Sequence, residues 1–278
     1  MINSAKSRFT RAVREWSTDR KFDPFVEYLL PSDTDLSTAI SSIESPNPIK
    51  SITHLGCDKL CSCCGRRMVR ISSLVVAVDG ACRRNGAGVS ARAAIGVFFH
   101  AYSSLNIAAT LPAEASTNQR AELTAGLRAL QMVYAQRKNN SLQYLFEPPA
   151  RARGQLVIES DSRYLVQGMT EWIVKWKQNG YRNARGISVT NADLFKALEK
   201  AVRQLNSLGV EVLFWHVPRS LNQEADLLAN FALNAWEEIE SKINLGSYTY
   251  EFSAWAVVNE AWDSGRPARP SRFRIRTT

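Results

Sequence analysis

The sequence places acidic residues at the ends of predicted strands and at the starts of predicted helices. Four acids share this placement: Asp79, Glu122, Asp161 and Asp226. The first and third each follow a short apolar run, and the second and fourth each open an amphipathic run. Carboxylates gathered in one place are costly to bury unless positive charge joins them, and a pair of divalent metal ions is the simplest such partner.

Carboxylates of this kind suit the hydrolysis of a phosphodiester. Two metal ions roughly 3.5–4 Å apart can activate the attacking water and stabilise the leaving oxygen. Magnesium prefers hard oxygen ligands, and the pattern contains no compulsory imidazole or thiolate ligand. The four acids therefore predict a site for two Mg²⁺ ions, for which Mn²⁺ could substitute.

The elements that must position these acids follow from the hydrophobic pattern. Three apolar runs predict an antiparallel meander of strands over Leu74–Val78, Ala93–Phe99 and Leu105–Thr110. Further along, the pattern predicts helices over Gln119–Arg137, Ser162–Lys177, Asn191–Leu208 and Asn222–Lys242, and strands over Leu156–Glu159 and Val210–His216. Strands followed by alternating helices and strands predict an α/β fold in which helices flank a mixed sheet.

The order of the acids and their flanking residues resembles type 1 ribonuclease H, of the eukaryotic or fungal kind. The resemblance covers roughly Leu74 to Ala235 and is carried by VDGAC, TNQRAEL, DSRYLVQGMTEWIVKWKQNGYRNARG, NADLFKAL and HVPRSLNQEAD. It implies the ribonuclease H-like fold, with a mixed five-stranded sheet. It also implies cleavage of the RNA strand of RNA–DNA hybrids, leaving 5′-phosphate and 3′-hydroxyl ends.

The resemblance implies a role for each acid. Asp79 would bridge both metal ions, and Asp226 would hold the ion that activates water. Glu122 and Asp161 would hold the ion on the side of the leaving group. With His216, these acids are the expected catalytic residues.

His216 ends a predicted apolar strand and precedes Asp226 at the family's spacing. The family histidine in this place lies on a flexible loop near the attacking water, where it assists proton transfer or product release. The segment that follows, Val217–Leu221, departs from the Gly-rich segments of the bacterial enzymes. Pro218 would stiffen the backbone next to the histidine.

The resemblance also implies residues that contact the hybrid. Short amides and backbone groups would reach the minor groove, where the 2′-hydroxyls of one strand are read. The segment Trp172–Arg182 interleaves aromatic and basic residues, a composition typical of a groove for a phosphate backbone. The expected contacts are Asn85, Thr117, Asn118, Gln119, Trp172, Lys175, Lys177, Arg182 and Asn191. We expect Trp176 to face the core.

The overall composition bounds the class of protein. The chain has 278 residues, a hydrophobic fraction of 45% and a formal net charge of +9, which suits a globular protein with a polyanionic partner. No apolar run is long enough to cross a bilayer, and no secretory signal stands near Met1. We therefore expect an intracellular monomer, nuclear or cytoplasmic, with no membrane partner. The basic segment after Met1 leaves a mitochondrial presequence open.

Three regions are expected along the chain. Residues 1–70 lack the features of the family and are expected to form a partly disordered N-terminal extension with a Cys-rich end. Residues 71–245 are expected to form the catalytic domain. Residues 246–278 are expected to form a C-terminal extension whose arginines make a basic tail.

The Cys-rich end contains four of the five cysteines: Cys57, Cys61, Cys63 and Cys64. Thiolates suit a zinc ion, although the spacing is not a paired C-x-x-C pattern. Reduced thiols that pack against the catalytic domain are the favoured interpretation, and redox chemistry is a third. A disulfide framework is disfavoured because the count is odd and no secretion signal is present.

Two other functions compete with hybrid cleavage. A catalytically silent hybrid-binding module would not need acids that face phosphates. A ribonuclease H domain derived from a retroelement would be expected to accompany a polymerase segment, and this sequence contains none. The sequence therefore favours a metal-dependent endonuclease.

Overall fold

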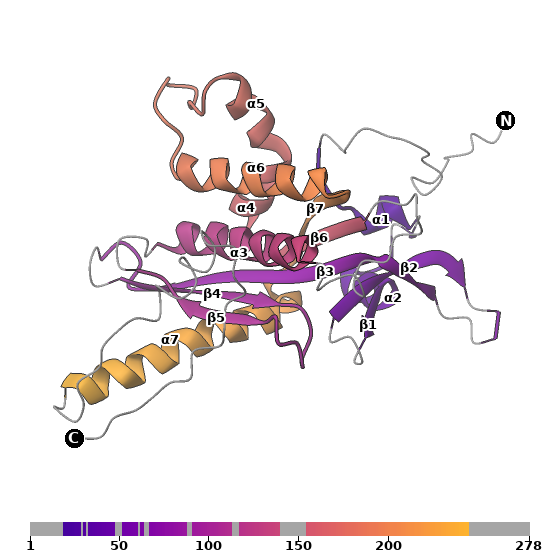
Figure 1. The fold of residues 1–278 in the computed structure, drawn as a ribbon, viewed down its shortest axis with the longest axis horizontal. Coiled ribbons are helices and arrows are strands. Elements are labelled where there is room, and N and C mark those ends of the chain that lie inside the picture. The colour runs from indigo at the N-terminus through magenta and orange to yellow at the C-terminus, as the bar shows by residue number, and fades with distance from the viewer. Residues whose placement is uncertain are drawn as a thin grey trace. The chain divides into compact units, whose positions relative to one another are not determined.

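The structure is a computed structural model that describes residues 19–28, 30–31, 33–47, 52–60, 62–63, 67–87, 91–112, 117–139 and 154–244. The chain divides into two compact units, Met1–Leu233 and Asn234–Thr278. The sheet and all the residues predicted to form the site belong to the first unit (Figure 1).

The described residues form a seven-stranded mixed sheet. Its strands are β1 (Glu44–Asn47), β2 (Ile52–Leu60), β3 (Arg67–Arg83), β4 (Arg92–Phe98), β5 (Ile107–Thr110), β6 (Gly154–Ser160) and β7 (Val210–His216). The long strand β3 pairs antiparallel with β2 and β4 and parallel with β6, which in turn pairs parallel with β7. The predicted α/β fold with a mixed sheet is confirmed. All five expected strands are present, and β1 and β2 extend the sheet.

The helices follow the predicted order. They are α1 (Pro24–Glu27), α2 (Leu36–Ile43), α3 (Asn118–Lys138), α4 (Arg163–Gln167), α5 (Ile173–Gln178), α6 (Ala192–Ser207) and α7 (Gln223–Asn244). The single helix expected over Ser162–Lys177 is divided, because a π-helical turn, Gly168–Trp172, joins α4 to α5. A 3₁₀ turn, Arg219–Leu221, leads into α7.

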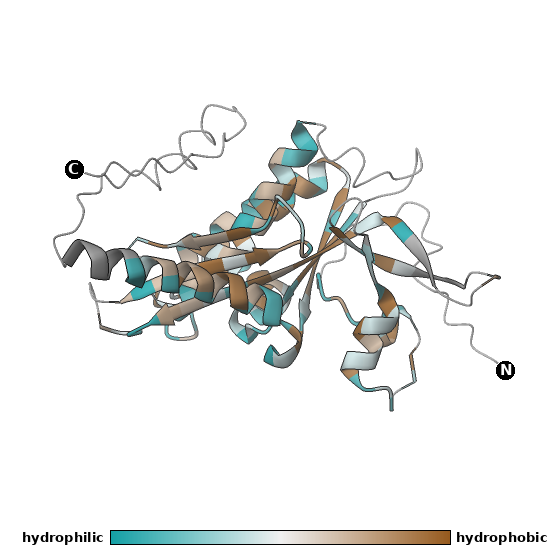
Figure 2. Ribbon diagram, turned by 90° about the horizontal axis from the view of Figure 1, so that it is seen from below, coloured by the Kyte–Doolittle hydropathy of each residue, from teal (hydrophilic) through white to brown (hydrophobic). Residues whose placement is uncertain are grey.

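Helices α3 and α6 cover one face of the sheet (Figure 1). Apolar residues of β3 and β6 belong to the same hydrophobic core as Leu123 and Leu130 of α3 and Phe195 and Leu198 of α6. The strands are coloured mostly as hydrophobic in Figure 2, and polar residues gather on the helices. Within the described part of the chain, no helix has the length and apolarity needed to span a membrane.

The N-terminal segment contributes to the fold beyond its strands. Phe22 and Tyr28 pack with Trp215 and Val157 on the other face of the sheet, and the rings of Phe22 and Trp215 lie 5.0 Å apart. Phe22 N donates to Phe214 O at 2.9 Å, which covers the outer edge of β7. Strand β3 itself runs through residue 70. The residues expected to be an extension are therefore continuous with the sheet, and the domain boundaries remain predictions.

Candidate active site

Two of the four acids lie side by side at one edge of the sheet. Asp79 belongs to β3, and Asp161 directly follows β6. The two strands run parallel with Ala77 opposite Glu159, so two further residues along each strand bring Asp79 level with Asp161. Side chains alternate between the faces of a sheet, so equivalent positions on neighbouring strands face the same way. The prediction that strand ends gather these acids is consistent with this register.

Glycine residues next to Asp79 allow the two helices that carry the other acids to approach. A Cβ atom at Gly80 would lie 2.1 Å from the backbone N of Glu122 in α3. Gly96 of β4 stands opposite Asp79 in the sheet, and a Cβ atom there would lie 2.0 Å from Ala225 O in α7. These glycines therefore place Glu122 and Asp226 beside the strand that carries Asp79.

The carboxylates influence one another electrostatically. Burial raises the pKa of Asp79 to about 7, and the negative charges of Asp161 and Asp226 add to this rise. A hydrogen bond from the Gly80 amide and the positive charge of Arg219 lower the pKa. Burial also raises the pKa of Glu122; the hydrogen bond from Ser162 opposes the rise and the charge of Asp161 adds to it. Asp79 is 6% exposed. A buried group of acids that repel one another in this way is a place where a cation would be stabilising.

Hydrogen bonds from neighbouring side chains orient Glu122 and Asp161. Glu122 Oε1 accepts from Asn118 Nδ2 at 2.7 Å, and its Oε2 accepts from Ser162 Oγ at 2.6 Å. Asp161 Oδ1 accepts from Asn222 Nδ2 at 3.1 Å. Sequence reasoning missed Ser162 and Asn222, although each directly adjoins a helix start close to one of the predicted acids.

Among the described residues, the carboxylate of Asp226 has two side-chain partners, and neither was predicted. Asn230, one turn along α7, donates from Nδ2 to Asp226 Oδ2 at 3.0 Å. The guanidinium of Arg219 forms an ion pair with Asp226 Oδ1. The sequence feature that could have pointed to Arg219 is its place in the segment that departs from the family pattern. Its cation reaches a carboxylate that the resemblance assigns to a metal ion.

The chemistry of these groups fits divalent metal ions. Four carboxylates offer hard oxygen ligands, which Mg²⁺ and Mn²⁺ prefer, and the charges of Asp161 and Asp226 repel that of the buried Asp79. Among the described residues, no three His, Cys, Asp or Glu side chains are already arranged to hold a metal ion. Metal binding would therefore require the carboxylates to turn away from some of their present partners, Arg219 among them.

His216 lies in a different setting from the one the resemblance implies. It is the last residue of β7 and stands opposite Ser160 in the sheet, rather than on a loop. Val217 N donates to Ser160 O at 3.1 Å, which extends the pairing beyond the histidine. Within the described residues, no hydrogen bond or ion pair joins His216 to the four acids, and Arg219 occupies the contact with Asp226. The role of His216 in catalysis remains a prediction.

Four of the residues predicted to contact the hybrid meet at the start of α3. Thr117 is the N-cap of α3, and its hydroxyl accepts from Arg120 N at 3.3 Å. Asn118 N donates to Asn85 Oδ1 at 3.3 Å, which joins the turn after β3 to the helix. Gln119 is exposed. These four predicted contacts therefore lie together, and Asn118 links them to Glu122.

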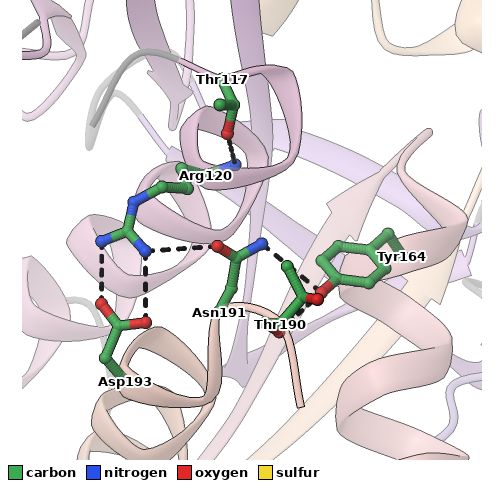
Figure 3. Close-up of polar contacts among 6 residues, drawn as sticks. All are labelled: Thr117, Arg120, Tyr164, Thr190, Asn191 and Asp193. Carbon is green, nitrogen blue, oxygen red and sulfur yellow. Dashed lines mark hydrogen bonds and ion pairs between the residues drawn. The ribbon is translucent and has the colours of Figure 1, made fainter. Parts of the chain in front are cut away.

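A polar network joins this region to α6, where Asn191 precedes the helix (Figure 3). Arg120 binds Asp193 through two hydrogen bonds, of 2.8 and 3.2 Å, and donates to Asn191 Oδ1 at 3.2 Å. Asn191 adopts a left-handed conformation with φ of 60°, which asparagine tolerates better than most residues. Because Asp193 neutralises Arg120, the network holds Asn191 in place without adding net positive charge.

The two tryptophans of the predicted basic segment pack against other aromatic side chains. Trp176 contacts the ring of Phe195, with centroids 4.8 Å apart, and joins the main core. Trp172 packs edge-on against Tyr164, with centroids 6.0 Å apart. Trp172 is half-buried, so one part of its ring is accessible from outside.

The three basic residues of this segment differ in their surroundings. Lys175 is exposed on α5. Lys177 forms an ion pair of 2.8 Å with Glu199, which is 1% exposed and also pairs with Arg20 at 2.6 Å. Arg182 is exposed but donates to Gly186 O at 2.6 Å. The structure thus gives Lys177 an internal partner, because a buried carboxylate requires a counter-ion.

The cysteine cluster falls mostly outside the described residues. Cys61 and Cys64 lie there, as does the side chain of Cys57, and Cys63 is exposed. The described residues therefore give the zinc hypothesis no support.

Known proteins resemble the region that carries the site. A model of the RNase H family matches residues 72–234. Ribonuclease H1 of Homo sapiens is 34% identical over 160 residues, which cover 56% of this chain and 48% of the relative. Ribonuclease H of Schizosaccharomyces pombe is 35% identical over 155 residues, which cover 56% of this chain and 51% of the relative. The chain spans about half the length of these curated relatives.

Among solved structures, a foamy viral protease-reverse transcriptase in complex with dsDNA aligns with a TM-score of 0.42 and 21% identity, covering 57% of this chain and 92% of that one.

The family match extends over more than half of the chain and contains all four acids, His216 and every predicted nucleic-acid contact. The chain therefore belongs to the ribonuclease H family, and the resemblance inferred from its motifs is confirmed.

Proposed function

We propose that this member of the ribonuclease H family cleaves the RNA strand of RNA–DNA hybrids with two divalent metal ions, Mg²⁺ or Mn²⁺. The products would carry 5′-phosphate and 3′-hydroxyl ends. The observation that carries the proposal is the register of β3 and β6, which brings the buried Asp79 level with Asp161. Burial raises the pKa of Asp79 to about 7, and the charges of Asp161 and Asp226 add to this rise. Neighbouring carboxylates that are buried in this way repel one another, and a bound cation would stabilise their charged forms.

Different carboxylates of the chain would bind the two ions. When bound, the two ions would activate the attacking water and stabilise the leaving oxygen. The charges of both Asp161 and Asp226 act on Asp79, which supports its predicted bridging role. Glu122 is oriented by Asn118 and Ser162, so its carboxylate is held near Asp161.

Recognition of the hybrid would involve the start of α3. Asn118 contacts both Asn85 and Glu122, so an amide that reads the minor groove would also be coupled to a metal ligand. Such a link would place the strand with 2′-hydroxyls next to the acids. Lys175 is the exposed cation of α5 best placed to meet the phosphates of the other strand.

Cleavage of matched substrates tests this proposal. The chain would be incubated with a labelled RNA–DNA hybrid and with DNA–DNA and RNA–RNA duplexes of the same sequence, in Mg²⁺ and in EDTA. We expect cleavage of the hybrid alone, in Mg²⁺ alone, with the label on fragments that end in 3′-hydroxyl and 5′-phosphate groups. Hybrid binding without cleavage would instead support the silent binding module, and comparable cleavage of duplex DNA would indicate another class of nuclease.

A further inference from the structure

We propose that Asn222 is a positioning residue that fixes the carboxylates of the candidate metal centre relative to one another. The inference rests on the metal-dependent function proposed above. Asn222 is 1% exposed and stands between the 3₁₀ turn and α7. It belongs to neither the four acids nor the residues that the sequence predicted to bind the hybrid.

The side chain of Asn222 joins two strands of the sheet. Its Nδ2 donates to Val78 O at 3.1 Å and to Asp161 Oδ1 at 3.1 Å. Val78 directly precedes Asp79 in β3. These partners lie 144 and 61 residues away in the sequence. One amide group therefore ties the backbone next to Asp79 to the carboxylate of Asp161.

The backbone of Asn222 reaches a third acid. Its carbonyl oxygen accepts from Asp226 N at 3.2 Å, which closes the first turn of α7. The start of the helix, and with it the position of Asp226, is therefore set from Asn222. Through these contacts the residue relates three of the four acids to one another.

The chemistry of the partners fixes the orientation of the amide. A backbone carbonyl and an ionised carboxylate can only accept hydrogen bonds, so the nitrogen of Asn222 must face both. Its Oδ1 then points elsewhere, where it is buried and has no hydrogen-bond partner among the described residues. Leaving a buried acceptor without a donor is costly, and a water molecule held by a bound metal ion would supply one.

Asparagine is well suited to this position. Its NH₂ group offers two donors from one atom, which matches two acceptors on different strands. Aspartate would present oxygens to both acceptors, and alanine would leave both without this donor. Groups that orient the ligands of a metal in this way typically change metal affinity about 10- to 100-fold when they are removed.

Calorimetric titration with Mg²⁺, in the absence of nucleic acid, tests the inference. We expect the Asn222→Ala protein to bind Mg²⁺ about 10-fold or more weakly than the wild-type chain. Asn106→Ala is the matched control, because the Asn106 side chain also makes two hydrogen bonds, accepting from Phe99 N and donating to His100 O at 2.8 Å each. That control should lose thermal stability but keep the wild-type affinity for Mg²⁺.

The outcomes separate this inference from the function on which it rests. A folded Asn222→Ala protein that binds Mg²⁺ as tightly as the wild-type chain would overturn the positioning role alone. A wild-type chain that binds no Mg²⁺ would overturn the proposed function as well. Should Asn222→Ala fail to fold, Asn222→Ser keeps a residue favoured before a helix, and unchanged affinity in that protein would equally overturn the role.

Discussion

The guanidinium of Arg219 is paired with the carboxylate of Asp226, one of the four acids of the candidate site. Arg219 lies in the short segment between β7 and α7, where the sequence departs from the family pattern. The arginine therefore supplies a cation to a carboxylate that a metal ion would also require. Any divalent ion that uses Asp226 has to compete with it.

Replacing Arg219 should favour metal binding. In Arg219→Ala, Asp226 loses its competing cation, so less Mg²⁺ should be needed to fill the site. The side chain of Arg219 is largely exposed, and exposed ion pairs contribute about 0.2–1 kcal/mol, which corresponds to a gain in affinity of about 1.5- to 5-fold. Calorimetric titration measures it, with the exposed Arg185→Ala as control. Weaker Mg²⁺ binding in Arg219→Ala would show that the arginine assists the metal.

The stability of the metal-free protein should depend on pH through Asp79. Its pKa rises from the ordinary value of 3.8 to about 7 on folding, so the folded protein holds a proton that the unfolded chain releases. This contribution to stability is complete below about pH 4 and is lost as the pH rises through about 7. Urea denaturation in EDTA across this range should show the decline. Asp79→Asn should make the decline shallower, and part of it should remain because burial also raises the pKa of Glu44 to about 7 and raises that of Glu122. An equal decline in that variant would assign the effect to other groups.

Lys175 and Lys177 should have different effects although they lie on the same short helix. Lys175→Ala should weaken hybrid binding and reduce the log–log salt slope by about 0.9 if one phosphate contact is lost. Lys177→Ala should instead lower the free energy of unfolding by about 1 kcal/mol. This is less than the roughly 3–5 kcal/mol lost when a fully buried ion pair is broken, because Arg20 still pairs with Glu199. Salt titrations of binding and urea denaturation measure the two effects. Equal salt slopes in both variants would contradict the assignment.

Gly80→Ala should disturb the site by displacing α3. The added Cβ atom would lie 2.1 Å from Glu122 N, a clash with backbone that no side-chain rotation relieves. We expect a loss of at least about 1–3 kcal/mol in stability, together with lower hybrid cleavage. In the control Gly126→Ala, on the same helix, the nearest atom belongs to the flexible side chain of Leu165, at 3.1 Å. Similar losses from both substitutions would argue against a special role for Gly80.

The sequence was sufficient to predict the parts of the fold that depend on local periodicity. The apolar runs of β6 and β7 and the amphipathic pattern of α3 and α6 reflect burial directly, so these elements were predicted close to their observed bounds. The prediction for β3, Leu74–Val78, covered only the apolar middle of a strand that spans Arg67–Arg83. Strands β1 and β2 were not predicted. The sequence of β2, Ile52–Leu60, contains polar residues and a glycine that obscure the alternating pattern of a strand. The π turn that begins at Gly168 was not predicted, because hydrophobic periodicity does not distinguish it from an α-helix. At Gly168 an added Cβ atom would lie 2.3 Å from the ring of Phe195, on another helix, which the local pattern does not show.

The site was predictable only as far as its motifs extend. The acids stand in recognisable segments, whereas Asn222 acquires its role through partners 144 and 61 residues away. Lys177 was expected to bind the hybrid because composition shows its charge but not its pairing with Glu199. Arg219 contacts Asp226 because a 3₁₀ turn brings it back toward α7, and that turn has no strong signal in the sequence.

The Asp79→Asn substitution tests most directly whether the four acids perform metal-dependent chemistry on a hybrid. Cleavage of a labelled hybrid in Mg²⁺ and binding of the same hybrid would be measured side by side for the wild-type and variant chains. We predict that the variant loses cleavage but binds the hybrid as tightly or more tightly, because it loses a metal ligand and also a negative charge that repels phosphate. Cleavage at the wild-type rate by the Asp79→Asn protein would contradict the account.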